Sequence, residues 1–381
     1  MSVLRILHLV GSADNDFYCD LSRLYAQDCI AATTNPSLYE FHIAYITPDR
    51  QWRFPSSLSS EDIAAAKPMS LSEAIKYITA QTIDLVLPQM FCIPGMTEYR
   101  ALLDLLNIPY VGNTPDLMAL TAHKARAKAI VAAAGVKVPF GELLRQGDIP
   151  TIKPPVVIKP ASSDNSCGVA LVKDVADYDA AIKTAFEHSD EVLVEEYIEL
   201  GREVRCGIVV KDGELVGLPL EEYLVNPHDH PIRNYEDKLK RTEDGDLSLT
   251  AKDGVKAWMV DPSDPLTEPV QAVAKRCHQA LGCRHYSLFD FRIDPQGQPW
   301  FLEAGLYCSF SPKSVIASMA KASGISVNEL LMTAIDQTLI DTAGCRKLGT
   351  ENNVTLRPGE SDQQLASFSQ SLQQWREVAR S

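Results

Sequence analysis

The sequence lacks long hydrophobic runs. No apolar stretch in its 381 residues approaches the roughly 20 residues that a helix needs to cross a bilayer, so we expect no membrane-spanning segment and no membrane partner. The apolar start at residues 3–10 is short and has no cleavage-like tail. We therefore predict a first strand there rather than a signal peptide.

The chain is also poor in positive charge. Its 36 Lys and Arg residues face 50 Asp and Glu residues, which gives a formal net charge of -14. Non-specific nucleic-acid binding requires a basic surface, so we expect no nucleic-acid partner. A local basic pocket for a nucleotide is not excluded.

Cysteine pairs and nucleophile motifs are missing as well. The nine cysteines are scattered, odd in number and form no CxxC pair, so we expect reduced thiols in a cytoplasmic protein. No GxSxG elbow occurs, and no histidine lies near Cys19, Cys167 or Cys308 in the sequence.

The length is compatible with two or three domains. Residues 1–120 alternate strand-like and helix-like patterns, which predicts an N-terminal domain with a parallel α/β sheet. The expected strands cover 6–10, 41–46, 83–87 and 108–112, and the expected helices 21–31 and 71–79.

Residues 121–201 are predicted to form a small α+β unit, with a helix over 122–134 that ends at Gly135, two strands around Lys159, a helix over 177–187 and a strand over 191–197. Residues 202–345 contain strands at 204–210, 215–219, 286–293 and 300–304, then helical patterns over 314–343. The polar insertion 226–264 is too long for a turn and is typical of a binding loop or lid. Residues 346–381 are predicted to be a tail helix.

Lys159 is the most informative residue. It follows the apolar residues 155–158 and precedes a small polar loop, residues 161–168. A lysine at a strand end is a fixed positive charge, and the backbone N–H groups of a Ser/Gly loop are donors that a polyphosphate can use. Lys124 and Lys238 are, taken singly, more typical of solvated surface residues.

Two acids can face each other across a predicted hairpin. Asp290 lies on the strand before the turn 295–298, and Glu303 lies on the returning strand. Inward-facing carboxylates repel unless a cation lies between them, and Mg²⁺ suits oxygen ligands. The alternative is that one acid pairs with a lysine or arginine or lies in solvent. His228 and His230 are better explained by a surface turn than by a metal site.

Taken in order, these elements resemble the ATP-grasp superfamily, and most closely the D-alanine–D-alanine ligase family. The resemblance covers about residues 3–335 and is most specific at 123–139, 154–172, 191–203 and 289–330. It implies an N-terminal parallel-sheet (pre-ATP-grasp) domain followed by a two-part α+β ATP-grasp fold. In that fold 121–201 is the central subdomain and 202–345 the C-terminal subdomain, with 226–264 as the active-site loop. It also implies ATP and Mg²⁺ as cofactors, small-molecule substrates and a homodimer.

The resemblance assigns roles to individual residues. Phosphates would be bound by Lys124, Lys159 and Lys238, under a loop that contains Ser166 and Gly168. The adenine would be read by Glu195, Glu196 and Ile198 and lined by Tyr197 and Leu302, with Glu203 on the ribose. Mg²⁺ would be bound by Asp290 and Glu303, and the amino-acid carboxylate by Ser314.

The departures from the family concern the substrate side. The family's asparagine after the metal glutamate is Gly305 here, so one Mg²⁺ ligand is missing and the metal count stays open. Its arginine before the metal aspartate is Leu288, and its tyrosine after the loop lysine is Leu239. The N-terminal glutamate and the His-Gly turn have no match in 11–16 and 87–91.

The stretches 7–29 and 86–104 resemble the MysD-type ligases of mycosporine-like amino acid biosynthesis. The departures described above are compatible with this resemblance. That resemblance implies phosphorylation of a donor oxygen and condensation with an amino-acid amine, with mycosporine-glycine as donor and serine or threonine as acceptor. D-Ala–D-Ala or other dipeptide formation is the alternative, and a non-catalytic nucleotide-binding protein is a second one. The amino-acid preference and the general base are not given by the residues.

We expect Lys159→Met to abolish nucleotide-driven condensation, because it removes a fixed positive charge from the phosphate site. The measurement is ADP release coupled to product formation. Full turnover in the variant would contradict the assignment of Lys159.

Overall fold

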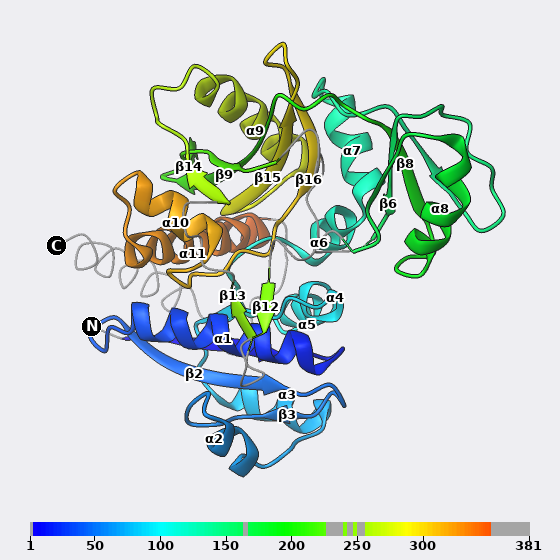
Figure 1. Ribbon diagram of the computed structural model, residues 1–381. Coiled ribbons are helices and arrows are strands. Elements are labelled where there is room, and N and C mark those ends of the chain that lie inside the picture. The colour runs from blue at the N-terminus through cyan, green and yellow to red at the C-terminus, as the bar shows by residue number, and fades with distance from the viewer. Residues whose placement is uncertain (1–2, 163–166, 226–238, 242–246, 250–255, 352–381) are drawn as a thin grey trace.

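The computed structural model describes residues 3–162, 167–225, 239–241, 247–249 and 256–351 (Figure 1). Within these ranges the chain forms four sheets with helices packed around them. The mixed α/β fold class is confirmed. The sheets fall inside the predicted segments 1–120, 121–201 and 202–345, whose boundaries remain predictions.

The N-terminal sheet has the order β3-β2-β1-β4. Strands β1 (Leu4–Gly11), β2 (Tyr39–Ile46) and β4 (Leu85–Pro88) are parallel, and the short β3 (Trp52–Arg53) joins β2 antiparallel. The helices are α1 (Asp16–Thr33), α2 (Ser60–Ala65), α3 (Leu71–Ala80), α4 (Ile93–Met96) and α5 (Glu98–Leu105).

The expected strand at 108–112 is wrong. Only an isolated bridge between Val86 and Tyr110 forms. Pro109 has no N–H to continue a ladder, and the chain turns at Gly112, whose φ is 100°.

The second sheet has the order β5-β8-β6-β7 and is antiparallel throughout. Its strands are β5 (Gly141–Leu144), β6 (Val156–Pro160), β7 (Ala170–Val172) and β8 (Val192–Glu196), and η1 (Val175–Asp177) leads into α8 (Tyr178–Phe186). The expected helix over 122–134 is found as α7 (Lys124–Ala133), and α6 (Pro115–Ala122), which was not predicted, precedes it. His123 separates the two helices: its ring accepts from the Arg126 N–H at the start of α7 and bonds Glu191 (2.9 Å), while Gly135 ends α7 with φ 78°, as predicted.

The third sheet has the path β14-β11-β9-β15-β16, with β10 paired to β9. Its strands are β9 (Arg202–Lys211), β10 (Glu214–Gly217), β11 (Glu221–Tyr223), β14 (Ala257–Met259), β15 (Tyr286–Ile293) and β16 (Pro299–Ala304). Helices α9 (Thr267–Leu281), α10 (Val315–Ala322) and α11 (Val327–Glu351) accompany it. The pattern analysis did not foresee α9.

Part of the polar insertion is ordered. Strands β12 (Leu239–Arg241) and β13 (Leu247–Leu249) form a small hairpin that Figure 1 shows beside α1. Strand β14 and residues 256–264 also belong to the insertion. Its residues 226–238, 242–246 and 250–255 lie outside the described residues, as do residues 352–381 of the predicted tail helix.

The cores connect the sheets. One cluster joins the N-terminal sheet to β15, α10 and α11, with Ile6 and Leu87 packed in the same group as Leu288 and Ile335. A second buries α7 and α9 against β15 and β16 around Phe291. The position of α7 is therefore fixed by the same core that supports the Asp290 strand.

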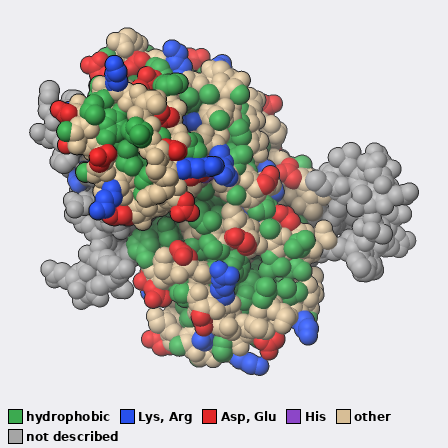
Figure 2. All heavy atoms as spheres, turned by 90° about the vertical axis from the view of Figure 1, so that its right-hand side faces the viewer, with side chains coloured by type: hydrophobic (Ala, Val, Ile, Leu, Met, Phe, Trp, Pro, Cys, Tyr) green, Lys and Arg blue, Asp and Glu red, His purple; other side chains and the backbone are tan. Residues whose placement is uncertain are grey.

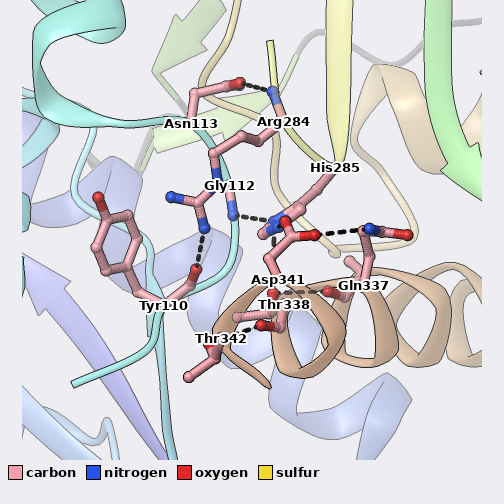
Figure 3. Close-up of polar contacts among 10 residues, drawn as sticks. Tyr110, Gly112, Asn113, Arg284, His285, Gln337, Thr338, Asp341 and Thr342 are labelled. Carbon is pink, nitrogen blue, oxygen red and sulfur yellow. Dashed lines mark hydrogen bonds and ion pairs between the residues drawn. The ribbon is translucent and has the colours of Figure 1, made fainter. Parts of the chain in front are cut away.

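Polar contacts also tie the N-terminal part to the last sheet (Figure 3). Asn113 accepts from the N–H of Arg284 (2.7 Å) and donates to the carbonyls of Tyr286 (3.1 Å) and Leu306 (3.4 Å). Gly112 has no room for a side chain, because a Cβ there would lie 2.6 Å from the Tyr286 hydroxyl. At this junction the contacts of Asn113 use backbone groups in and beside the last sheet, and the lack of a side chain at Gly112 allows the two segments to approach closely enough to form them.

His285 is the centre of this junction. Its Nδ1 accepts from the Gly112 N–H (2.8 Å), so the proton is on Nε2, which faces Asp341 at 3.2 Å. Burial lowers the pKa of His285 below its usual 6.5, and it also lowers the pKa of His8 to about 3 and of His278 to about 4.

No helix among the described residues is long and apolar enough to cross a membrane. On the face that Figure 2 shows, basic side chains do not gather into an extended patch, in line with the acidic composition.

We expect the protein to lose stability as the pH falls below about 6.5, because a histidine whose pKa is lower in the folded state takes up its proton on unfolding. His285→Asn tests one such group. Asparagine tolerates the positive φ of 39° and offers an acceptor to Gly112, but it does not titrate. Chemical denaturation between pH 7.5 and 5 measures how far the free energy of unfolding falls. This fall should be smaller in the variant than in the parent, by up to about 1.4 kcal/mol per pH unit. If the unfolding free energies of parent and variant fall equally with pH, the role of His285 is contradicted.

Candidate functional site

The two predicted acids face each other. Asp290 on β15 is the register partner of Glu303 on β16, as the hairpin pattern predicted. Their side chains keep 12% and 36% exposure respectively, so Asp290 is the more deeply desolvated of the two. Their role as Mg²⁺ ligands remains a prediction. No group of three or more His, Cys, Asp or Glu side chains in the described ranges could bind a metal by itself.

Each acid has a basic partner. Arg205, opposite Asp290 on β9, holds both carboxylate oxygens of Asp290, Nη2 to Oδ2 at 2.9 Å and Nε to Oδ1. Burial opposes the charge of Arg205, but Asp290 outweighs it and raises the pKa of the guanidinium. The alternative that one acid pairs with a lysine or arginine is therefore observed for Asp290. It leaves metal binding open, because two carboxylate oxygens offer about four lone-pair sites.

Lys124 reaches the second acid. It is the first residue of α7, and its Nζ lies 3.6 Å from Glu303 Oε2. Its backbone N–H donates to the Ala161 carbonyl (2.8 Å), which fixes the start of α7 against the end of β6. One lysine thus connects the second sheet to the β15–β16 hairpin.

Lys159 is buried at the end of β6 and contacts Glu195. Its Nζ lies 2.7 Å from Glu195 Oε2, and Lys128 contacts the other oxygen of the same carboxylate. The carboxylate of Glu195 is thus engaged with two lysines, and the expected contact of Glu195 with adenine remains a prediction. Lys159 also lies within electrostatic range of Glu303, which places both clusters at one site.

The hinge after β8 is organised by Arg292. Its guanidinium donates to the Ile198 carbonyl (3.1 Å) and to Glu203 (3.3 Å), and it lies 5.2 Å from the centre of the Tyr197 ring. Three predicted nucleotide residues are therefore joined by one side chain. Glu196 instead accepts from the Phe140 N–H (2.9 Å) at the neighbouring strand. The remaining adenine-side residue, Leu302, is half-buried on β16.

Ser314, the residue predicted to bind the amino-acid carboxylate, caps α10. Its Oγ donates to the Ser309 carbonyl (2.6 Å) and accepts from the Ala317 N–H (3.3 Å). The same loop reaches α1 through an ion pair between Lys313 and Asp28 (2.9 Å). The loop that carries Ser314 is therefore anchored to the N-terminal domain.

An aromatic cluster lies beside this contact. Tyr25 on α1 packs edge to face on Phe91 (5.4 Å), which in turn approaches Tyr307 (6.2 Å between ring centres). Burial raises the pKa of Tyr25 to about 12, with a smaller opposing influence of Arg205. The N-terminal domain thus presents aromatic rings toward the loop after β16.

Two of the predicted positions cannot be placed and two glycines can. Ser166 and Lys238 lie outside the described residues. Gly168 has φ 68° and adjoins Pro160 and His188. A Cβ at Gly305 would meet only the Leu288 carbonyl, at 4.0 Å, so packing does not explain why a side chain is missing there.

Three functional candidates were missed by the pattern analysis: Lys128, Arg205 and Arg292. Lys128 follows Lys124 by four residues and so shares its helix face, a signal that was available. Arg292 alternates with Asp290 on one strand. Arg205 gave no such signal, since its partner is 85 residues away.

The residues fit a nucleotide with a divalent cation. Four basic side chains (Lys124, Lys128, Lys159 and Arg205) face three carboxylates (Glu195, Asp290 and Glu303), which leaves positive charge for a polyphosphate, and the facing acids can take a hard cation. Buried lysines on one sheet opposite paired acids on a second sheet are the arrangement that the resemblance to ATP-grasp enzymes predicts.

Comparisons with known proteins give the family. The family model described as D-ala D-ala ligase C-terminus matches residues 145–336. A D-alanine–D-alanine ligase of Maridesulfovibrio salexigens is 34% identical over 243 residues, which cover 62% of this chain and 74% of that one. The chain belongs to the D-alanine–D-alanine ligase family, an ATP-dependent enzyme family that uses Mg²⁺, as the sequence predicted.

Solved structures confirm the fold. The D-alanine–D-alanine ligase of Coxiella burnetii matches with a TM-score of 0.72 at 19% identity, over 93% of this chain and 99% of that one. The Bacillus anthracis enzyme complexed with ATP matches with a TM-score of 0.66 at 21% identity, over 89% and 99%. The predicted ATP-grasp fold is therefore confirmed.

We expect Arg205→Leu to destabilise the protein by roughly 3 kcal/mol without divalent cations, because it leaves Asp290 as an uncompensated buried charge. Millimolar Mg²⁺ should recover part of the loss. The measurement is the free energy of unfolding with and without Mg²⁺. Arg205→Lys, which keeps the charge, is the control, and a Leu variant as stable as the parent in both conditions would contradict the prediction.

Proposed function

We propose that this chain phosphorylates a donor oxygen with ATP and joins the donor carbon to the amine of an amino acid. The observation that carries the proposal is the convergence of Lys124, Glu303 and Asp290 where α7 meets the β15–β16 hairpin. Bound ATP would supply the phosphoryl group, and Mg²⁺ would neutralise its charge. The amine then replaces phosphate at the donor carbon and loses a proton.

The chain's own residues position and neutralise the reactants. Lys124 and Lys159 would bind phosphates, with Asp290 and Glu303 on the cation. Glu203 would take the ribose, held by Arg292, and Ser314 the amino-acid carboxylate. The insertion 226–264 would exclude water from the reactive phosphate, with Ser166 and Lys238 contributing from the loops.

Two donors are candidates. The name D-alanine–D-alanine ligase on the relatives favours dipeptide formation. Arg205 is paired with Asp290, so it does not by itself replace the cation that the family has at the position of Leu288. The aromatic cluster around Tyr25, Phe91 and Tyr307 favours the second candidate, mycosporine-glycine with serine or threonine, because a planar conjugated ring stacks on aromatic side chains. Cytoplasmic location and a homodimer remain predictions.

The test is ADP release by the purified chain with ATP and Mg²⁺ in three mixtures: D-alanine alone, mycosporine-glycine with serine or threonine, and no acceptor. We expect release above background in one of the first two, with the matching product by mass spectrometry. The mixture that responds identifies the donor.

Background hydrolysis in all three mixtures would contradict the ligase proposal for these substrates. Glu303→Gln is the control for the cation site, and we expect it to lose at least about tenfold in rate at fixed Mg²⁺ because one of the two facing carboxylates is gone.

A further inference from the structure

Lys128 has no role in the proposed reaction, yet it lies in the most buried ionic cluster of the site. It is one turn beyond Lys124 on α7, and its residue is only 4% exposed. Its Nζ contacts one oxygen of Glu195, and Lys159 Nζ contacts the other at 2.7 Å. Glu195 itself is 2% exposed. One carboxylate is thus shared by two lysines from two different elements.

The charge balance of this cluster matters for an anion. A buried Lys159–Glu195 pair alone would be neutral and would attract a polyphosphate weakly. The second lysine makes the group positive when all three are ionised. Burial lowers the pKa of Lys128 to about 7, whereas Glu195 raises the pKa of Lys159 despite its burial. Near neutral pH, Lys159 therefore keeps its positive charge more fully than Lys128 does.

A buried carboxylate that loses its partner carries a cost of several kcal/mol, so Lys159 could not leave Glu195 for a phosphate if it were the only partner. The packing supports a fixed Glu195. Its strand neighbour across β5–β8 is Gly141, and a Cβ there would lie 3.0 Å from Glu195 Cγ.

We propose that Lys128 and Glu195 are positioning residues of the nucleotide site. Glu195 aims Lys159 at the end of β6, and Lys128 keeps the carboxylate compensated so that Lys159 is available to phosphate. The inference rests on the proposed function, since it concerns the nucleotide of that reaction.

The experiment measures the ADP dissociation constant of the full chain with Mg²⁺ by calorimetry. The variants are Lys128→Met, Glu195→Gln and the double variant, and thermal unfolding confirms that each is folded. Lys183→Met on α8 is the matched control, because it removes an exposed lysine of the same sheet unit.

We expect Lys128→Met to weaken ADP binding at least about tenfold, since Lys159 then stays on Glu195. The double variant should return to within about threefold of the parent, and Lys183→Met should be unchanged. A purely structural lysine would lower the unfolding temperature without changing the affinity of the folded protein. Unchanged affinity in Lys128→Met, or no recovery in the double variant, overturns the proposal.

If Lys128→Met does not fold, Glu195→Gln and the double variant are compared. With a neutral amide at 195, removing Lys128 should change ADP affinity less than about twofold. A tenfold loss would show that Lys128 acts on the nucleotide directly and would overturn the positioning role. If the unmodified protein does not bind ADP, the proposed function itself is refuted. If it binds ADP and ligates its substrates, the variants test only the positioning role of Lys128 and Glu195.

Discussion

Buried carboxylates that each need a cation determine much of the arrangement of this site. Asp290 has Arg205 and Glu195 has two lysines, while the more exposed Glu303 has Lys124. Leaving Asp290 or Glu195 unpaired would cost several kcal/mol, a large share of a typical domain's stability. The ion pairs therefore couple α7, the β6–β8 sheet and the β15–β16 hairpin, and a ligand that competes for one pair affects the position of all three elements.

The family model matches residues 145–336, so the N-terminal sheet lies outside that match. The fold comparisons cover most of the chain, but residues 11–16 and 87–91 lack the glutamate and the His-Gly turn that the resemblance predicts. The aromatic cluster on α1 and the loop after β4 lie in the N-terminal part. Under the proposed function, nucleotide binding would depend mainly on the part of the chain that the family model matches, and the choice of donor on the N-terminal part.

The sequence predicted elements whose signal is local. Strand β15 was predicted at both of its ends, because its eight residues are mainly apolar and a turn follows directly. The start of α7 at Lys124 was not predictable, since no proline or glycine marks His123 and the contact of His123 with Glu191 spans 68 residues. Arg205 was missed for the same reason. Helix α9 directly follows the polar insertion, and its amphipathic spacing was a local signal that was overlooked. Lys128 could likewise have been found from its helical spacing to Lys124.

The junction in Figure 3 has a chemical consequence at Asn113. Its amide accepts from one backbone N–H and donates to two carbonyls, so both ends of the group are used. Aspartate has the same shape but no donor when ionised. Loss of ammonia from this one side chain during ageing of the protein would therefore set a negative charge against two carbonyl oxygens and loosen the join between the first sheet and the last.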